Sequence, residues 1–383
     1  MSETADVVIV GGGAVGVSAA YHLAVAGAGR VLVLERADAV GTGSTGACAG
    51  GFRHQFSSRI NIELSLASVP MILGFSEDHG LPLDVAQDGY LFLLRDERER
   101  EGFGRAAELQ RSLGVDARSL TPAEAVELVP GIATDDLLGA AFCPDDGIAD
   151  PGGLTQGYAT AARRAGAEIR LGSEVVEIAL ARGRAAAVRT ADEIIEAAAI
   201  VNAAGPWAGS IAASAGVALP LEPIPRMVVT TGPFDGMPAR RTLVIDAGTS
   251  YYFHREGDGV LTGMGGRHET ASFDVSVDHR FVEEELLPTA VRVFPPIEGA
   301  GVANMWAGLY EMTPDRHPII GESPVPGLFL ANGFSGHGFQ HAPVVGKLLA
   351  ELIVEGRART VDISPLGFDR FARGELVVEG HVV

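Results

Sequence analysis

The chain opens with an alternation of apolar strands and a helix of small residues. Residues 7–10 form a β-branched run, which is typical of a buried parallel strand. A helical pattern then continues to Ala26 and ends at Gly27, and residues 31–34 form a second apolar run. The order strand, helix, strand predicts a β-α-β unit at the start of a parallel sheet.

The later pattern predicts two kinds of region. The first continues the α/β character, with helices expected at about 58–73, 151–165 and 343–354 and strands at 168–171, 175–180 and 199–202. The second has short strand-like runs separated by Gly, Pro and Asp turns, as in an antiparallel sheet, at 227–231, 243–246, 250–254 and 260–264. A strand at 88–94 and helices at 96–113 and 278–294 complete the expected elements.

The length of 383 residues is too great for one small core, so two domains, or one large domain with an insertion, are expected. We predict an α/β nucleotide-binding domain whose chain leaves twice to build an antiparallel sheet. The nucleotide-binding domain is assigned to residues 1–78, 145–220 and 300–383, and the substrate domain to residues 79–144 and 221–299.

A glycine motif follows the first predicted strand directly. Gly11 permits a tight turn, Gly13 lets the backbone approach a pyrophosphate, and Gly16 lets the helix pack closely on the strand. The helix start offers unpaired N–H groups and a partial positive charge to phosphates. Glu35 ends the second strand, where a carboxylate accepts hydrogen bonds from ribose hydroxyls. The motif predicts a dinucleotide site and leaves the choice between FAD and NAD open.

Two further segments are rich in small residues. Residues 41–51 hold too many glycines for a strand or a long helix, so they predict a ligand surface lined by backbone. Residues 332–343, NGFSGHGFQHAP, combine three glycines with two histidines just after an apolar run. We interpret this second segment as a loop that lets backbone approach a ligand before the last long helix begins.

Charge and composition narrow the range of partners. The net charge of −20 argues against nucleic acid or an anionic membrane surface. No apolar stretch approaches the ~20 residues that span a bilayer, and no basic segment marks a signal peptide. The two cysteines, Cys48 and Cys143, are interpreted as free thiols in a reducing cytoplasm, and no Cys/His cluster suggests a metal. Lys347 is the only lysine of the chain.

Taken together, several segments resemble the D-amino-acid oxidase-like flavoproteins, in the branch of monomeric sarcosine oxidase, glycine oxidase and the β subunits of sarcosine oxidase and dye-linked proline dehydrogenase. The resemblance is carried by DVVIVGGGAVGVSAAYHLA, GSTGACAGGFRHQFSSRINIELS, VNAAGPWA, YEMTPDRHPIIG and GFSGHGFQHAPVVGKLLAELI. It implies an FAD-binding Rossmann-like domain with an inserted antiparallel-sheet substrate domain. It also implies oxidation of a primary or secondary amine of an amino acid to an imine, which water hydrolyses.

The resemblance also implies which residues hold FAD. They fall in the first glycine motif, the 43–51 loop, two turns of the parallel sheet and the loop before the last helix. The expected set is Gly11, Gly13, Ala14, Val15, Gly16, Glu35, Arg36, Gly43, Ser44, Thr45, Ala49, Gly50, Gly51, Val175, Ala203, Ala204, Gly205, Trp207, Gly308, Gly333, Ser335, Gly336, His337, Gly338, Phe339 and Gln340.

The expected catalytic residues are Arg53, Tyr252, Tyr310, His337 and Gln340. By resemblance, Arg53 lies beside the flavin, where its guanidinium suits a carboxylate, and the two tyrosines shape the pocket. Gln340 stands where relatives often carry a lysine that helps to bind the substrate carboxylate.

Two further departures from the family pattern concern the chemistry. The segment before TPD lacks the cysteine that links FAD covalently in some members, so we predict FAD held without a covalent bond. Residues 252–268 contain no lysine of the kind that activates oxygen in some oxidases, so a dehydrogenase is favoured over an oxidase. An NAD(P)-dependent dehydrogenase and a flavoprotein subunit that needs a partner chain remain alternatives. Homo- or hetero-oligomers are both compatible with the sequence, and the substrate amine and the electron acceptor are not specified by it.

Overall fold

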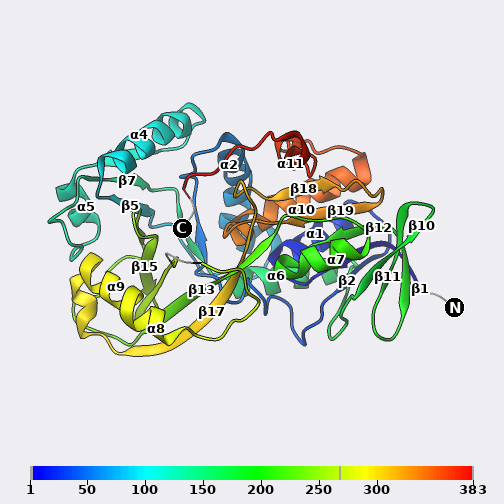
Figure 1. The fold of residues 1–383 in the computed structure, drawn as a ribbon, viewed down its shortest axis with the longest axis horizontal. Helices are drawn as coiled ribbons and strands as arrows, with labels where there is room; N and C mark the ends of the chain where they lie inside the picture. The colour runs from blue at the N-terminus through cyan, green and yellow to red at the C-terminus, as the bar shows by residue number, and fades with distance from the viewer. Residues whose placement is uncertain (1–2, 267–268, 382–383) are drawn as a thin grey trace.

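The computed structural model, which describes residues 3–266 and 269–381, shows two lobes, each built on its own eight-stranded sheet (Figure 1). The centre of the first sheet is parallel and contains β1 (Glu3–Val10), β2 (Val31–Leu34), β9 (Glu168–Arg170), β12 (Ile194–Asn202) and β19 (Leu328–Asn332). Antiparallel strands complete it, namely β10 (Glu177–Ala181), β11 (Arg184–Arg189) and β18 (Ile319–Glu322).

The first sheet is buried on both faces, which explains why β1 reads as a continuous apolar run. Val7 and Ile9 belong to one core cluster, whereas Val8 and Val10 belong to another on the opposite face. Helices pack against the first cluster or beside it; they are α1 (Ala14–Val25), α2 (Arg59–Leu73), α6 (Pro151–Arg164) and α10 (Gly338–Glu355). The short helices η1 (Gly205–Trp207) and α7 (Ala208–Ser214) follow β12.

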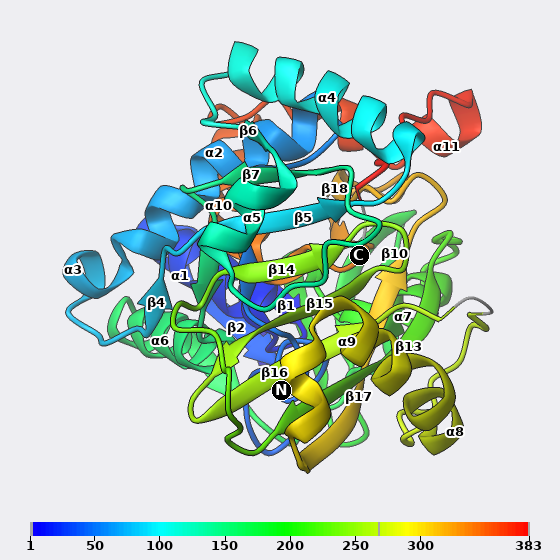
Figure 2. The same ribbon diagram turned by 90° about the vertical axis from the view of Figure 1, so that its left-hand side faces the viewer.

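The second sheet is antiparallel except for one parallel pair, β5 with β14. Its strand order is β17 (Val302–Met312), β13 (Glu222–Thr231), β16 (Gly259–Met264), β15 (Tyr251–Glu256), β14 (Leu243–Asp246), β5 (Tyr90–Leu94), β7 (Gly139–Cys143) and β6 (Arg118–Leu120). Helices α5 (Pro122–Leu128) and α9 (Leu287–Val293) lie in front of these strands in Figure 2, and together they enclose an apolar core. On the opposite face, residues of β13, β14, β15 and β17 form the wall of a site between the lobes.

Smaller elements connect the two lobes. A three-stranded sheet has the order β3 (Gly51–Phe52), β8 (Gly147–Ala149) and β4 (Val85–Ala86). Helix α4 (Glu97–Ser112) begins with a capping box between Asp96 and Glu99, and α5 begins with a capping box between Thr121 and Glu124. The remaining short helices are α3 (Phe75–His79), α8 (His279–Phe281), the turns Val282–Leu286, Pro295–Gly299 and Ser364–Leu366, and α11 (Arg370–Arg373).

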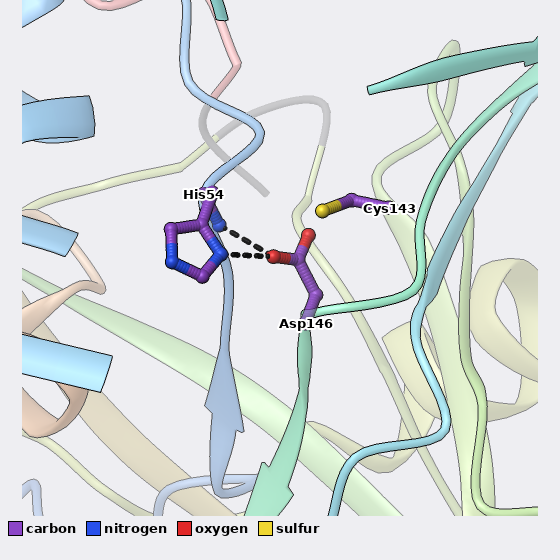
Figure 3. Close-up of side chains that lie close together, drawn as sticks. All are labelled: His54, Cys143 and Asp146. Atoms are coloured by element: carbon purple, nitrogen blue, oxygen red, sulfur yellow. Dashed lines mark hydrogen bonds and ion pairs between the residues drawn. The ribbon is translucent and has the colours of Figure 1, made fainter. Parts of the chain in front are cut away.

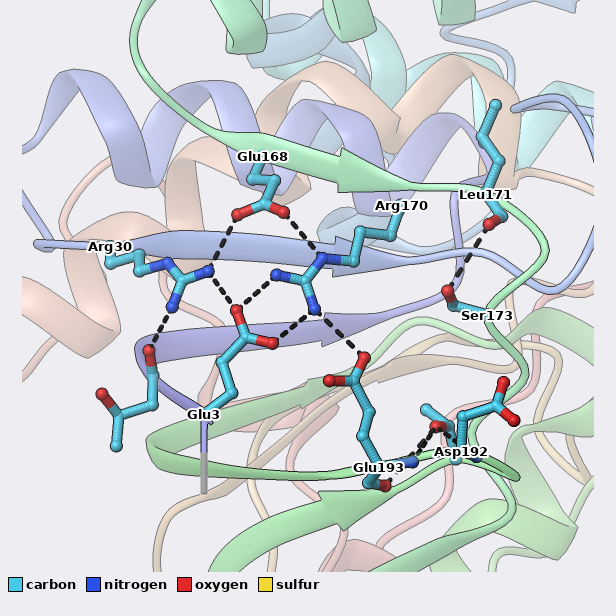
Figure 4. A network of polar contacts seen from close by, with 10 residues as sticks. Glu3, Arg30, Glu168, Arg170, Leu171, Ser173, Asp192 and Glu193 are labelled. Atoms are coloured by element: carbon cyan, nitrogen blue, oxygen red, sulfur yellow. Dashed lines mark hydrogen bonds and ion pairs between the residues drawn. The ribbon is translucent and has the colours of Figure 1, made fainter. Parts of the chain in front are cut away.

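A network of ion pairs joins the start of β1 to β9 and to the turn before β2 (Figure 4). Glu3 binds both Arg30 and Arg170, and Glu168 binds the same two arginines. The hydrogen bonds from Arg170 and Arg30 lower the pKa of Glu3 to about 2. Because these side chains lie at the partly exposed edge of the first lobe, we assign the network to holding the sheet together.

Two expected boundaries differ from the structure. Residues 302–312 were assigned to the nucleotide-binding domain, but β17 pairs with β13 along its length and belongs to the second sheet. The last long helix was expected from residue 343, but α10 begins at Gly338, with Pro343 inside it. At Pro343 the helix lacks the N–H that would bond to the carbonyl of Phe339, and outside the helix Ser68 Oγ donates to the neighbouring carbonyl of Gln340 at 2.6 Å.

Candidate active site

A cavity of about 730 Å³ lies where the two lobes meet, and we call it the central cavity. Its lining runs from the glycine turn after β1, through residues 41–51, to the free face of the second sheet and the turn before α10. Every expected site residue lines it except Gly16, Gly50, Gly333 and Ser335. The structure therefore brings together residues from four distant parts of the chain.

The four exceptions support the lining from behind. A side chain at Gly16 would collide with the carbonyl of Gly11, so this glycine allows α1 to pack on the strand. Gly50 and Gly333 have φ values of +77° and +73°, where other residues are strained. Ser335 holds its loop by accepting a hydrogen bond from Thr313 N at 3.2 Å. These positions shape the site without facing it.

The nucleotide end of the cavity has the features that a pyrophosphate needs. Gly13, the N-cap of α1, has no side chain to cap the helix, and although Thr45 Oγ1 lies 3.3 Å from Ala14 N, the first turn still presents further N–H groups to an anion. Gly11 has φ +107°, which the tight turn requires. Glu35 directly follows β2 and accepts hydrogen bonds from Gly12 N at 2.6 Å and Ala37 N at 2.8 Å. Its carboxylate is thereby fixed at the cavity wall.

Beyond Glu35 the cavity continues between Val175 and an arginine–tryptophan pair. The Arg36 guanidinium lies 3.5 Å from the centre of the Trp207 ring, a cation–π contact. Phe273 stacks on the same tryptophan with ring centres 6.0 Å apart. This end has flat, apolar surfaces suited to an adenine ring.

Residues 41–51 are held from both lobes. Thr45 Oγ1 accepts a hydrogen bond from Ala14 N at 3.3 Å, and Ser44 Oγ donates to the carbonyl of Leu309 at 2.6 Å. The indole of Trp306 donates to the carbonyl of Ala47 at 3.2 Å. The glycine-rich loop is therefore anchored to α1 on one side and to β17 on the other.

The wall of the cavity on the second sheet combines tyrosines with apolar side chains. Tyr252 projects from β15, and its hydroxyl occupies the space that a side chain at Gly263 would fill. Burial raises the pKa of Tyr252 well above its usual value, so the phenol stays protonated. Leu243 and Ile245 of β14 line the same wall. A small substrate would meet a largely dry surface here.

Tyr310 lies between a backbone turn and a cation. Its ring packs where a side chain at Gly336 would stand, and Gly336 has φ +93°. On β13, the Arg226 guanidinium lies 4.8 Å from the ring centre. Burial raises the pKa of Tyr310, although the nearby Arg226 opposes this shift. Sequence reasoning did not identify Arg226, because a lone arginine in a strand carries no motif.

Arg53 is almost fully buried, with 4% of its surface exposed, and the protein itself engages its guanidinium. One terminal nitrogen donates to the carbonyl of Gln55 and the other to the carbonyl of His381. The second nitrogen also lies 3.3 Å from His337 Nε2. Burial and the charge of Arg53 hold the pKa of His337 well below its usual value, so this histidine is neutral.

Gln340 binds the backbone of Arg53. Its Oε1 accepts from Arg53 N at 3.1 Å, and its Nε2 donates to Arg53 O at 3.1 Å. The same Nε2 lies 3.0 Å from Ser65 Oγ. The side chain that replaces the lysine of relatives thus fixes the position of the arginine in this structure.

His54, the next residue, takes part in a buried cluster with Cys143 and Asp146 (Figure 3). Possible ligand atoms of the three lie within 4.8 Å of one another, a grouping that spacing along the sequence did not reveal. Asp146 already accepts hydrogen bonds from His54 N and Nδ1, both at 2.7 Å, and from Gln55 Nε2 at 3.0 Å. We assign the cluster to holding residues 53–55 against the turn between β7 and β8.

Fold and cavity together define a dinucleotide-dependent oxidoreductase whose catalytic surface is an antiparallel sheet. The glycine N-cap of α1, the fixed Glu35 carboxylate and the end of the cavity beside Trp207 fit FAD, with Gly11, Gly13, Glu35, Arg36 and Val175 positioned to hold its adenosine and phosphates.

Comparison with known proteins agrees with this assignment. The family model described as FAD dependent oxidoreductase matches residues 6–352, and the chain belongs to this family. The FAD-dependent oxidoreductase domain-containing protein 1 of Bos taurus is 33% identical over 98% of this chain and 87% of its own length. The solved L-proline dehydrogenase from P. horikoshii has a TM-score of 0.91 and 34% identity over 98% of this chain and 100% of its own. Glycine oxidase of Geobacillus kaustophilus is 30% identical over 97% and 98% of the two chains.

These similarities decide the cofactor that the glycine motif left open. The protein is an FAD-dependent oxidoreductase of a family that acts on amino acids and amines. Within the described ranges, 3–266 and 269–381, no helix has both the length and the apolar composition that crossing a membrane requires.

Proposed function

We propose that the protein is a dehydrogenase that oxidises the amine of an amino acid or N-alkyl amino acid to an imine. The observation that carries the proposal is the central cavity, which connects the dinucleotide end to a wall holding Tyr252 and Tyr310. When bound, FAD supplies the hydride acceptor. The apolar side chains of Leu243 and Ile245 exclude water around the substrate. The uncapped start of α10 at Gly338 places a partial positive charge at the cavity, which favours negative charge there.

The position of the only lysine favours a dehydrogenase over an oxidase. Lys347 is exposed on α10 and does not line the cavity, so it is not available to activate oxygen beside the cofactor. The similarity to L-proline dehydrogenase also supports a dehydrogenase. An oxygen-using oxidase is the second candidate, and the similarity to glycine oxidase favours it.

The two candidates separate in one experiment. The purified holoprotein is screened anaerobically with amino acids and N-methyl amino acids, and flavin bleaching identifies substrates. Oxygen is then admitted. Slow reoxidation, with fast turnover when an artificial electron acceptor is added, is expected. Rapid reoxidation with stoichiometric peroxide would establish the oxidase instead.

We further propose that FAD is held without a covalent bond. The segment from Gly308 to Thr313 contains no cysteine, and burial raises the pKa of Cys48, the cysteine at the cavity wall, to about 11. Acid precipitation should release all the flavin into the supernatant. Flavin that remains in the protein pellet would contradict this.

Assembly and location are also proposals. A homo- or hetero-oligomer is compatible with the family, and the ability of the isolated chain to turn over substrate with an artificial acceptor tests whether a partner is needed. A cytoplasmic location is proposed because Cys48 and Cys143 are both free thiols. Localisation of the tagged full-length protein in intact cells tests it.

A further inference from the structure

Arg226 is a cation on the sheet wall of the central cavity, where no assigned role explains it. It lies on β13 next to the lining residue Val228, and 12% of its side chain is exposed. Its guanidinium lies over the ring of Tyr310. We propose that Arg226 binds the carboxylate of the substrate, and that Glu269 occupies this position when substrate is absent. The proposal rests on the amino-acid substrate argued above.

The other arginines of the cavity are already engaged. Arg36 stacks on Trp207 at the adenosine end. Arg53 donates to two backbone carbonyls, contacts His337, and lies 4.1 Å from the ring centre of Phe56. Using the terminal nitrogens of Arg53 for a bidentate pair with a substrate would compete with the carbonyls of Gln55 and His381. Arg36 is held at the adenosine end by Trp207 and Arg53 by backbone carbonyls, which leaves Arg226 as the lining arginine whose charge partner among the described residues is a displaceable side chain.

Arg226 instead faces a carboxylate that belongs to the protein. Its Nε lies 2.7 Å from Glu269 Oε1, and its NH2 donates to Glu269 Oε2 at 3.1 Å. This two-point approach is the way a guanidinium receives any carboxylate. The pairing is incomplete, because the buried Nε–H makes no hydrogen bond of good geometry among the described residues. A substrate carboxylate would supply that bond.

Glu269 is suited to being displaced. It is an exposed residue that follows β16, and one quarter of its side-chain surface is accessible to solvent. Its other hydrogen bond comes from Gly266 N at 3.1 Å, close by in the chain. Replacing Glu269 by a substrate carboxylate returns its charge to water, where a carboxylate is well solvated. The apolar wall of Val228 and Ile245 then surrounds the substituents on the amino acid.

Binding of a carboxylate that is not a substrate tests this inference without requiring catalysis. Acetate is the probe and acetamide its neutral match, and each is titrated into the holoprotein while perturbation of the flavin spectrum is followed at constant ionic strength. Arg226→Gln should raise the Kd of acetate by roughly 10- to 150-fold, the loss of one charged hydrogen-bonded pair. Glu269→Gln should lower it, because the internal competitor loses its charge. Arg280→Gln, which breaks the solvent-exposed pair between Arg280 of α8 and Glu284 of the following turn, is the matched control and should leave the Kd of acetate unchanged.

The outcomes decide the inference independently of the proposed function. An acetate Kd unchanged by Arg226→Gln, or raised to this extent only by Arg53→Gln, overturns it, as does the absence of acetate binding to the wild type. If the Arg226→Gln protein does not retain FAD, the Glu269→Gln protein provides the test. An acetate affinity that is equal to or weaker than that of the wild type then overturns the inference. If no amino acid reduces the wild-type flavin, the proposed function fails while the acetate titration still tests Arg226.

Discussion

Gly336 shows how a single position connects backbone conformation to the site. Its φ of +93° disfavours any side chain, and a Cβ there would collide with the ring of Tyr310. Gly336→Val should therefore displace both the turn and Tyr310 and raise the Kd of FAD by roughly tenfold or more, which corresponds to at least about 1.4 kcal/mol. Fluorescence titration of the apoprotein with FAD measures the effect.

Gly356 provides the control for this substitution. It has φ +77° at the end of α10, and no atom lies within 4 Å of where its Cβ would stand. Gly356→Val should cost about 1–2 kcal/mol of stability through backbone strain alone and leave FAD affinity unchanged. A Gly336→Val protein that binds FAD as the wild type does would show that the turn does not support the cofactor site.

Glu311 predicts a pH dependence. Burial raises its pKa to about 7, against the opposing hydrogen bonds from Gly333 and Phe334, and its buried Oε2 has no hydrogen-bond partner among residues 3–266 and 269–381. When the pKa of an acid is higher in the folded than in the unfolded state, the protein loses stability as the pH rises from the unfolded pKa through the folded pKa, here about 7. Glu311→Gln removes this loss.

The relative stability of Glu311→Gln should thus increase from pH 5 to pH 8, by on the order of 1–2 kcal/mol. Urea denaturation at four pH values measures the difference, and Glu298→Gln, at an exposed position, is the control. Parallel stability curves for Glu311→Gln and the wild type would show that Glu311 ionises freely in the folded protein.

At the scale of single residues, the sequence predicts the roles of glycines better than the contacts of charged side chains. Gly11 and Gly336 were predicted to line the site because a tight turn or a close approach demands their residue type locally. The partners of Arg53 were not predictable, because His381 and Gln340 lie 328 and 287 positions away. Pairing over such distances depends on how the lobes pack, and no local pattern encodes it.

Among the elements, the C-terminal segment binds the start of α2. Glu379 accepts hydrogen bonds from Ser57 N at 2.8 Å and Ser58 N at 3.1 Å, and from Asn61 Nδ2 at 3.2 Å. A carboxylate at this position also complements the helix dipole. The carbonyl of His381 then accepts from Arg53, while the His381 ring stacks 3.9 Å from Phe103 of α4. One segment therefore connects α2, Arg53 and the second lobe.

Glu379→Gln should destabilise the protein by about 1–3 kcal/mol at pH 7, because a buried, charge-assisted cap is lost. Burial opposes ionisation of Glu379, but hydrogen bonds from Ser57, Ser58 and His381 outweigh it and hold its pKa well below the usual value. A carboxylate whose pKa is depressed in the folded state stabilises the fold when the pH is above its unfolded pKa, near 4.5. This stabilisation is lost as the pH falls below that value.

The difference in unfolding free energy between wild type and Glu379→Gln should accordingly shrink as pH is lowered from 6 to 3. Chemical denaturation across this range measures it. Glu375→Gln, an exposed residue of the same segment that pairs with Arg373, should cost less than 0.5 kcal/mol or so at every pH. A pH-independent difference for Glu379→Gln would mean that the residue acts through packing and not through charge.

For elements, strands and helices with strong periodicity were predictable, whereas their sheet membership was less so. The expected strand runs from 227 to 264 all lie in the second sheet. Strand β17 was assigned to the wrong domain because its neighbour β13 lies about 80 residues earlier, and long-range pairing leaves no local signal.

For the whole molecule, the central cavity is the place where the lobes depend on each other. The cofactor loop is anchored to the second sheet through Ser44 and Ala47, and the Nε2 of His254 lies 3.1 Å from the carbonyl of Ala49. Since the residues that line the cavity come from both lobes, FAD binding should stabilise both lobes against unfolding. At a free FAD concentration of 100 Kd, this adds about 2.7 kcal/mol to the free energy of unfolding.

The two tryptophans of the chain report on the two lobes separately. Trp207 follows β12 of the first sheet, and Trp306 lies on β17 of the second. In the single-tryptophan proteins Trp207→Phe and Trp306→Phe, saturation with FAD should raise the urea midpoint reported by each remaining tryptophan. An FAD-dependent shift confined to the protein that retains Trp207 would show that the second sheet takes no part in holding the cofactor. Substrate oxidation would then not take place between the lobes, because a hydride acceptor bound by the first lobe alone would not require the tyrosines and Arg226 of the second.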